Sequence, residues 1–375
     1  MIRIFHLITS LDRGGAETML SKLVASPSEK ICHTVISMIP GGSYEDFLKQ
    51  QGVEVLSLEM TKGMPSFTAV RQLKRLLEKR RPDVLQTWLY HADLLGLIAG
   101  RISNTPVVAW NIRCSDMDLS RYSFISRVLP HLLAKISGSV SACVVNSRAG
   151  RQVHEAFGYR PKKWAFIPNG FDLERLRPNA RIRAEVRTAW QISDDAQVIG
   201  MVARFDPMKD HFGLIAVLAR LIGCGKNVVL VFAGKGCEAQ GCLADEVSRL
   251  GLDGQVRLLG EVSRVEEILP GFDVFALASF TEGFPNVVGE AMACGVPAVT
   301  TDVGDCREII GETGRVVPIG DREAFSKALI EILDTDGDAR SRLSLAARER
   351  IKTHYSLSAI VGLYEEFYGE LLGKL

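Results

Sequence analysis

Short apolar runs alternate with longer amphipathic stretches along the whole chain. A first series of apolar runs predicts strands at Ile2–Leu7, His33–Met38, Val53–Ser57, Val84–Thr87, Val107–Ala109, Ala142–Val145 and Trp164–Ile167. Helical periodicity lies between them, at Thr18–Ala25, Phe67–Lys79, Asp93–Arg101, Tyr122–Ile136 and Ser147–Phe157. A second series predicts strands at Val198–Val202, Val228–Ala233, Val256–Leu259, Val274–Ala278, Val296–Thr300 and Arg315–Val317. This alternation indicates parallel sheets covered by helices on both faces.

Two such series predict an α/β protein of two doubly wound, Rossmann-like domains. The polar segment Pro168–Pro178 is the natural linker. We expect an N-terminal domain over residues 1–170, a second domain over residues 171–352, and a C-terminal helix over residues 353–375 that is placed to cross back to the first domain.

Length and composition agree with this organisation. A chain of 375 residues usually forms two domains. Its 47% apolar and 24% charged residues are typical of a soluble globular protein. Arg3 and His6 interrupt the short apolar start, no apolar run is long enough to cross a membrane, and the eight cysteines form no Cys-x-x-Cys pair. We therefore expect a cytoplasmic protein with reduced thiols.

The segment Ser279–Val299 contains two carboxylates, Glu282 and Glu290, separated by seven residues. Glu282 follows a predicted strand, and Pro285 suits the first position of the next helix. Glu290 then lies about a turn and a half inside that helix. The first N–H groups of the helix, from Asn286, Val287 and Val288, are suited to holding a phosphate. The pattern indicates a site for a nucleotide diphosphate sugar.

Over these residues the sequence resembles the retaining glycosyltransferases of family 4, which have the GT-B architecture of two Rossmann-like domains facing a cleft. The resemblance implies that Glu282 lies beside the donor sugar and that Glu290 binds the ribose hydroxyls. It also places Gly283, Phe284, Pro285 and Asn286 around the sugar and the phosphates, a set to which the pattern adds Val287 and Val288.

Arg204 and Lys209 follow the first strand of the second series. The departing diphosphate gains negative charge, which two cations on one loop could stabilise. The resemblance assigns that role to both residues. The family often has glycine after the lysine, whereas this chain has Asp210.

Glycine-containing turns follow other strands. Gly14 and Gly15 precede a helix and resemble the family's N-terminal glycine loop, but the full dinucleotide-binding pattern is missing there. Gly234 resembles the family's glycine turn near the nucleotide, and Val262 lies where the base is usually held.

On the acceptor side, His91 follows the strand Val84–Thr87, in a position where family members often have a histidine near the donor sugar. Asn111 and Arg113 follow the next strand and are candidate acceptor or donor contacts. Asp116 and Asp118 form an Asp-x-Asp pattern that is common in turns, so no metal site is predicted there. We expect no cofactor and no metal.

These observations predict a retaining transferase of hexosyl or N-acetylhexosaminyl groups. Its donor would be a UDP-sugar, with a GDP-sugar as the other option, and its acceptor a hydroxyl of a saccharide or lipid-linked saccharide in cell-surface glycan synthesis. Glu282, His91, Arg204 and Lys209 are the predicted catalytic residues. A nucleotide-sugar epimerase of the same architecture, or a non-catalytic nucleotide-sugar-binding subunit, are the alternatives.

Charge is unevenly distributed. Residues 1–175 carry 23 Lys and Arg against 15 Asp and Glu, or +8, whereas residues 176–375 carry 22 against 29, or −7. The stretches Ala69–Arg81 and Tyr122–Leu133 are cationic and amphipathic. They predict either binding to an anionic membrane surface, with the protein peripheral at the inner face of the cell membrane, or ordinary packing on the sheet. No nucleic-acid partner is expected.

Overall fold

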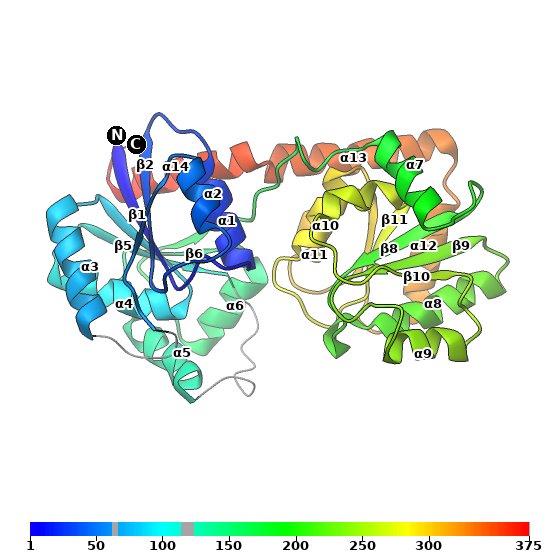
Figure 1. Ribbon diagram of the computed structural model, residues 1–375, viewed down its shortest axis with the longest axis horizontal. Coiled ribbons are helices and arrows are strands. Elements are labelled where there is room, and N and C mark those ends of the chain that lie inside the picture. Colours follow the sequence, from blue (N-terminus) through cyan, green and yellow to red (C-terminus); the bar gives the residue numbers. More distant parts are fainter. Residues whose placement is uncertain (62–66, 114–123, 375) are drawn as a thin grey trace. The chain divides into compact units, whose positions relative to one another are not determined.

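The computed structural model describes residues 1–61, 67–113 and 124–374, and the chain forms two compact units (Figure 1). Unit 1 contains Met1–Gly170 and Leu357–Leu375, and unit 2 contains Phe171–Ser356. The change from unit 1 to unit 2 at Gly170 falls inside the segment Pro168–Pro178.

Unit 1 contains a seven-stranded parallel sheet with the order β3-β2-β1-β4-β5-β6-β7. Its strands are β1 (Ile2–Ile8), β2 (Ile31–Ser37), β3 (Glu54–Ser57), β4 (Val84–Trp88), β5 (Val107–Ile112), β6 (Ala142–Val145) and β7 (Trp164–Phe166). Its helices are α1 (Gly15–Ala25), α2 (Glu45–Gln50), α3 (Phe67–Arg80), α4 (Tyr90–Ile102), α5 (Phe124–Ile136), α6 (Arg148–Phe157) and α14 (Leu357–Leu371).

Alternate residues of the strands bury into two different helix layers. In β1, Ile4 and Ile8 belong to the core shared with α1, α2 and α14, whereas Phe5 and Leu7 face α3 and α4. Helix α5 covers the neighbouring strands on the α3–α4 side. The continuous apolar runs in the sequence thus reflect strands that are covered on both faces.

The C-terminal helix α14 belongs to unit 1. Its Tyr364 stacks on Trp88 at 6.5 Å between ring centroids, and its Tyr368 donates a hydrogen bond to Gln86. The second unit ends at Ser356 rather than at residue 352, because helix α13 continues to Tyr355, whose ring is buried in the core of unit 2.

Unit 2 contains a six-stranded parallel sheet with the order β10-β9-β8-β11-β12-β13. Its strands are β8 (Gln197–Val202), β9 (Val228–Ala233), β10 (Val256–Leu258), β11 (Val274–Leu277), β12 (Ala298–Thr301) and β13 (Arg315–Val317). Its helices are α7 (Ala180–Ala189), α8 (His211–Gly223), α9 (Cys242–Arg249), α10 (Asn286–Ala293), α11 (Cys306–Ile310), α12 (Arg322–Leu333) and α13 (Gly337–Tyr355).

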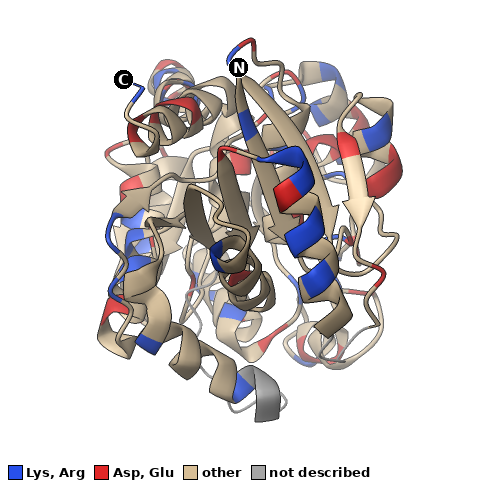
Figure 2. Ribbon diagram, turned by 90° about the vertical axis from the view of Figure 1, so that its left-hand side faces the viewer, with Lys and Arg blue, Asp and Glu red and all other residues tan. Residues whose placement is uncertain are grey.

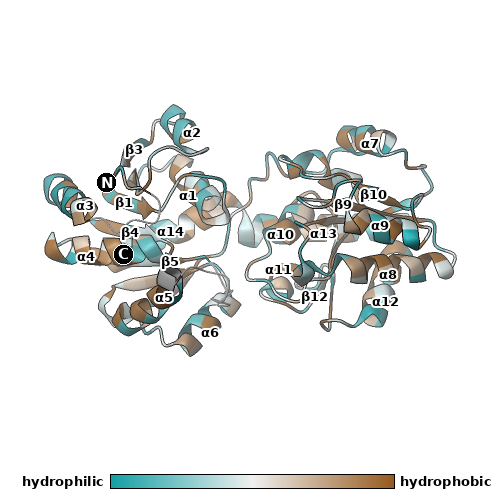
Figure 3. Cartoon of the chain, turned by 60° about the horizontal axis from the view of Figure 1, so that its bottom comes forward, coloured by the Kyte–Doolittle hydropathy of each residue, from teal (hydrophilic) through white to brown (hydrophobic). Residues whose placement is uncertain are grey.

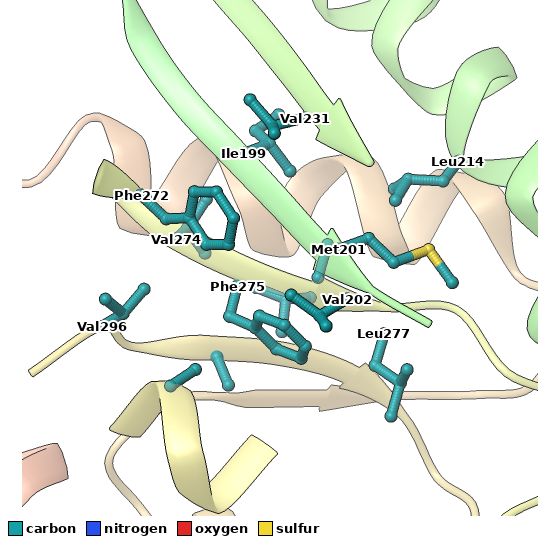
Figure 4. Close-up of a cluster of buried hydrophobic side chains, with 14 of the residues drawn as sticks. Ile199, Met201, Val202, Leu214, Val231, Phe272, Val274, Phe275, Leu277 and Val296 are labelled. Carbon is teal, nitrogen blue, oxygen red and sulfur yellow. The ribbon is translucent and has the colours of Figure 1, made fainter. Parts of the chain in front are cut away.

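The core of unit 2 is one continuous cluster around β8 and β11 (Figure 4). Phe272 packs directly over Gly200 of β8, where an added Cβ would lie 2.1 Å from the phenylalanine ring. This close packing holds the two central strands in place, and the site described below follows their carboxyl ends.

The predicted strands are confirmed, with small shifts at their ends. Strand β4 extends to Trp88 and β5 extends to Ile112, so Asn111 lies inside a strand and His91 lies in the first turn of α4. Both positions were expected in loops. The side chains of Trp88 and Trp110 are completely buried, which explains why these strands continue.

Candidate functional site

Loops that follow five strands of unit 2 are tied together by backbone hydrogen bonds at the carboxyl edge of the sheet. The loop after β8 donates from Phe205 N to Lys235 O after β9, at 2.7 Å. Gly234 N in turn donates to Gly260 O after β10, at 2.7 Å. In the loop after β11, Phe280 N donates to Met208 O of the loop after β8, at 2.8 Å. The segment after β12 donates a backbone hydrogen bond to the same loop after β11. In parallel α/β sheets this edge is where ligands bind.

Two of these loops bring Lys209 and Glu282 together. The Lys209 Nζ lies 2.5 Å from Glu282 Oε1, and the Ser279 hydroxyl donates to the same oxygen at 2.7 Å. The side chains are mostly enclosed, with 21% of Lys209 and 13% of Glu282 exposed. Both of these contacts use Oε1. Among the described residues, Oε2 has no hydrogen-bond partner, so this oxygen can accept a bond from a ligand.

The backbone around Lys209 is locally capped at both ends. Asp206 accepts from Met208 N at 2.9 Å at the start of a short 3₁₀ turn, Pro207–Lys209. Asp210 then adopts a left-handed conformation, φ 51°, and accepts from Gly213 N at 2.9 Å to begin α8. Left-handed backbone favours glycine but tolerates aspartate, which explains how Asp210 can replace the family's usual residue.

Arg204 lies on the same loop with 70% of its side chain exposed. Its Nε donates to Asp206 Oδ2 at 3.2 Å, which orients the guanidinium. An exposed, oriented guanidinium is suited to bidentate contact with a phosphate.

Close backbone approaches explain two glycines at this edge. Gly234 has φ 144°, and an added Cβ would lie 2.1 Å from Ala203 O. Gly304, after β12, has φ 52°, and a Cβ would lie 2.3 Å from Gly283 O. Each glycine therefore allows two ligand-edge loops to pack backbone against backbone.

Helix α10 begins one residue later than predicted, because Pro285 is its N-cap and Asn286 its first residue. The N–H of Val288 already bonds to Pro285 O at 3.1 Å, so it is engaged within the helix start. The N–H of Val287 has no acceptor among the described residues. Glu290 lies half-buried further along the helix.

The remaining predicted residues of unit 2 lie at the rim of its core. The Phe284 ring stacks on Phe171, 6.3 Å between centroids, and Val262 is half-buried against the core. Because the Phe284 ring stacks on Phe171, Phe284 can support the loop that carries Glu282.

In unit 1, Gly14 is the N-cap of α1 and Gly15 is its first residue. The Glu17 carboxylate folds back over Gly14, where an added Cβ would meet Glu17 Oε2 at 2.2 Å. Partial burial raises the pKa of Glu17. A phosphate approaching this helix start would meet a carboxyl group, an arrangement that the sequence did not predict.

His91 is exposed in the first turn of α4, and partial desolvation lowers its pKa. The preceding Leu89 has φ 71° and ψ 159°, a conformation that only glycine adopts without strain. Two residues after His91, Asp93 is fully buried and accepts a hydrogen bond from Thr87 Oγ1 at 2.5 Å. Burial raises the pKa of Asp93 well above its usual value. Strain of this kind clusters at functional sites, which supports a role for His91.

Asn111 and Arg113 are drawn into the interior of unit 1. Asn111 is completely buried and donates to Tyr364 Oη at 2.9 Å, and Arg113 donates to Asn111 Oδ1 at 2.8 Å. The guanidinium also contacts Asn169, Tyr364 and the face of Trp88, and burial lowers the pKa of Arg113. The burial of Asn111 does not support its direct contact with an acceptor. Its contacts instead fasten β5 to α14.

Sequence reasoning missed Ser279 and Gly304. The signal for Ser279 was its position, immediately after an apolar strand and three residues before Glu282. Among the residues that the structure describes, no three His, Cys, Asp or Glu side chains gather in a way that could hold a metal ion. Asp116 and Asp118 lie outside those residues.

Two family models match the chain in succession. Residues 13–175 match the model described as Glycosyltransferase Family 4, and residues 182–350 match Glycosyl transferases group 1. Together these matches span both units.

Curated relatives cover most of the chain. An N-acetylgalactosamine-N,N'-diacetylbacillosaminyl-diphospho-undecaprenol 4-alpha-N-acetylgalactosaminyltransferase of Campylobacter jejuni is 26% identical over all of both chains. A UDP-Gal:alpha-D-GlcNAc-diphosphoundecaprenol alpha-1,3-galactosyltransferase of Escherichia coli is 23% identical over 84% of this chain and 82% of its own.

The fold is shared with solved structures. The Anabaena protein HepE, crystallised with UDP and glucose, superimposes with a TM-score of 0.80 at 19% identity, over 99% of this chain and 100% of HepE. The chain therefore has the GT-B fold, and it belongs to the family 4, group 1 glycosyltransferases.

Proposed function

We propose that the protein transfers a sugar, with retention of anomeric configuration, from a UDP-sugar to a hydroxyl of a saccharide or lipid-linked saccharide in cell-surface glycan synthesis. The observation that carries this proposal is the group of Lys209, Ser279 and Glu282. It holds one oxygen of a mostly enclosed carboxylate in place and leaves the other available to a ligand.

The roles follow from charge. Arg204, Lys209 and the start of α10 would stabilise the departing diphosphate, whose negative charge increases as the glycosidic bond breaks. Glu282 would hold a sugar hydroxyl through Oε2 and offset positive charge at the anomeric carbon. The acceptor hydroxyl would attack from the face that the diphosphate leaves, and its proton would pass to a leaving phosphate oxygen. Glu290 would bind the ribose, and His91 would lie near the donor sugar.

The choice of donor and acceptor rests on the relatives. HepE was crystallised with UDP, and one of the curated relatives has UDP-Gal in its name, which supports a UDP-sugar as the donor. The two curated relatives named above have a diphospho-undecaprenol saccharide in their names, which favours a lipid-linked acceptor here. Galactosyl and N-acetylgalactosaminyl groups are the first sugars to test.

The test is a panel of UDP- and GDP-sugars, first for binding and then for transfer to a diphospho-undecaprenol saccharide. NMR of the product gives its anomeric configuration. An axial donor linkage that becomes an axial product linkage supports retention, whereas inversion would overturn the proposed mechanism. Interconversion of the nucleotide sugars without transfer would instead identify an epimerase.

A further inference from the structure

The two helix layers of unit 1 carry opposite charge. Helices α3, α4 and α5 together contain eight Lys and Arg but two acidic residues, one of them the buried Asp93. Helices α1, α2 and α14, on the other face of the sheet, contain two Lys and six Asp and Glu. In Figure 2 the helix nearest the viewer, α3 by its place in Figure 1, carries blue residues along its length. Among these six helices, the net positive charge thus lies in one layer.

This basic layer also exposes large apolar side chains. Ile98 and Ile102 of α4 are 42% and 48% exposed, and Val128 and Leu132 of α5 are 46% and 42% exposed. Figure 3 shows hydrophobic colour on both helices. Ile98 and Ile102 lie one turn apart, between an edge of α4 that packs on α3 and an edge that packs on α5. They therefore form an apolar stripe on the outward side of α4.

Cations flank the stripe. Arg71, Arg75 and Lys79 lie at successive turns on the exposed side of α3, and Arg101 and Lys135 are exposed on α4 and α5. None of these five pairs with a carboxylate among the described residues, in contrast to Lys74, which bonds to Glu78. Four other leucines of α3 and α5 do not join this surface, because they are buried: Leu73, Leu77, Leu129 and Leu133. Helix α3 supplies charge, and α4 supplies the apolar contact.

We infer that the outward face of α3, α4 and α5 docks on an anionic lipid bilayer. Apolar side chains bordered by cations match the headgroup interface, where apolar groups reach the acyl boundary and cations meet lipid phosphates. No helix in the described part of the chain has the length and apolar character to cross a bilayer, so the contact would be peripheral.

The inference rests on the proposed function, because a lipid-linked acceptor must be reached at a membrane. His91 lies on the same side of α4 as Ile98 and Ile102, seven and eleven residues earlier. With the stripe on the bilayer, His91 would mark the end of α4 at which a saccharide on a lipid carrier enters.

Co-sedimentation of the full chain with vesicles tests the inference. Phosphatidylglycerol-containing vesicles should bind it at low salt, and phosphatidylcholine vesicles should not. Replacing Arg71, Arg75 and Lys79 with Gln should weaken binding by roughly 10- to 100-fold. The double variant I98S/I102S should weaken it by roughly 5- to 20-fold. Two matched controls change exposed residues of unit 2. The first neutralises Lys327, Arg342 and Lys352, and the second replaces Ile319 and Leu345 with Ser. Both controls should bind vesicles like the wild type.

Transfer assays separate this inference from the proposed function. Both unit 1 variants should retain wild-type transfer to a detergent-solubilised acceptor and lose it on an acceptor embedded in anionic vesicles. Transfer without any vesicle binding would overturn the docking surface alone, whereas vesicle binding without transfer would overturn the proposed function alone. Equal binding to neutral vesicles, or a dimer that I98S/I102S dissociates, would also overturn the assignment to anionic lipid.

Discussion

Lys209 Nζ lies 2.5 Å from Glu282 Oε1, so a cation from the loop after β8 and a carboxylate from the loop after β11 form one pair. The two residues are 73 positions apart in the chain. Because the loops are also joined by the bond from Phe280 N to Met208 O, the pair is supported by backbone as well as by charge.

Replacing Glu282 with Ala should lower kcat by about 100-fold or more, because a charge-stabilising contact is lost in the transition state. UDP affinity should remain nearly unchanged. The matched variant Glu290→Ala should instead weaken UDP binding by about 1.5–3 kcal/mol, through loss of a charged hydrogen bond. Calorimetry with UDP and steady-state kinetics check both. Wild-type turnover by Glu282→Ala would show that the site is wrongly placed.

Ser279 should act as a positioning residue for Glu282. Ser279→Ala removes one hydrogen bond to Oε1 and leaves the contact with Lys209, so kcat should fall by about 5- to 10-fold, with little change in KM for the donor. The control is Ser326→Ala, which removes a buried hydroxyl bonded to Arg322 O at 2.7 Å within α12. If both variants lose stability equally and neither loses kcat, Ser279 has only a structural role.

Gly234→Ala should destabilise unit 2 by about 1–3 kcal/mol and weaken nucleotide binding, because the new Cβ would collide with Ala203 O beside Arg204. Gly254→Ala is the control, since an added Cβ there meets no atom within 4 Å. Urea unfolding and UDP titration measure the two effects. Equal behaviour of the two variants would argue against the close loop packing.

Transfer should continue in the presence of a chelator, because in the proposed mechanism Arg204, Lys209 and the start of α10 would neutralise the diphosphate. The measurement is the rate with excess EDTA and with added magnesium or manganese. A rate that EDTA abolishes and either metal restores would contradict the prediction.

The free energy of unfolding should fall on acidification through His33. Burial lowers the pKa of His33 from 6.5 to about 4, and His6, which bonds to it at 2.9 Å, also has a lowered pKa because of burial. As the pH falls, the His33 side chain therefore becomes protonated in the unfolded chain at a higher pH than in the folded chain. The contribution of neutral, buried His33 to the free energy of unfolding is full above pH 6.5 and is lost between pH 6.5 and about 4.

His33→Gln keeps an acceptor for His6 and removes this titration. Between pH 7 and pH 4.5 the variant should lose roughly 2 kcal/mol less stability than the wild type, as measured by urea unfolding. Burial raises the pKa of Asp93, which acts in the opposite direction but is common to both proteins and cancels in the comparison. Parallel pH profiles for the two proteins would refute the role of His33.

The sequence by itself determined the order of the strands and helices, the two sheets and the segment that carries Glu282 and Glu290. These features depend on local patterns: apolar runs, helical periodicity, and proline and glycine at the ends of α10. Each is readable because its physical cause lies within a few residues along the chain.

Tertiary structure alone decided which groups meet. Asn111 donates a hydrogen bond to Tyr364, which lies 253 residues later in the chain. Glu282 forms its ion pair with Lys209, which lies in a loop that follows a different strand. Likewise, periodicity identified amphipathic helices but not which apolar side chains would remain outside. Ile98 and Ile102 stay exposed because α3 and α5 cover only the two edges of α4. Burial is set by the neighbours that long-range packing supplies, and local sequence does not encode those neighbours.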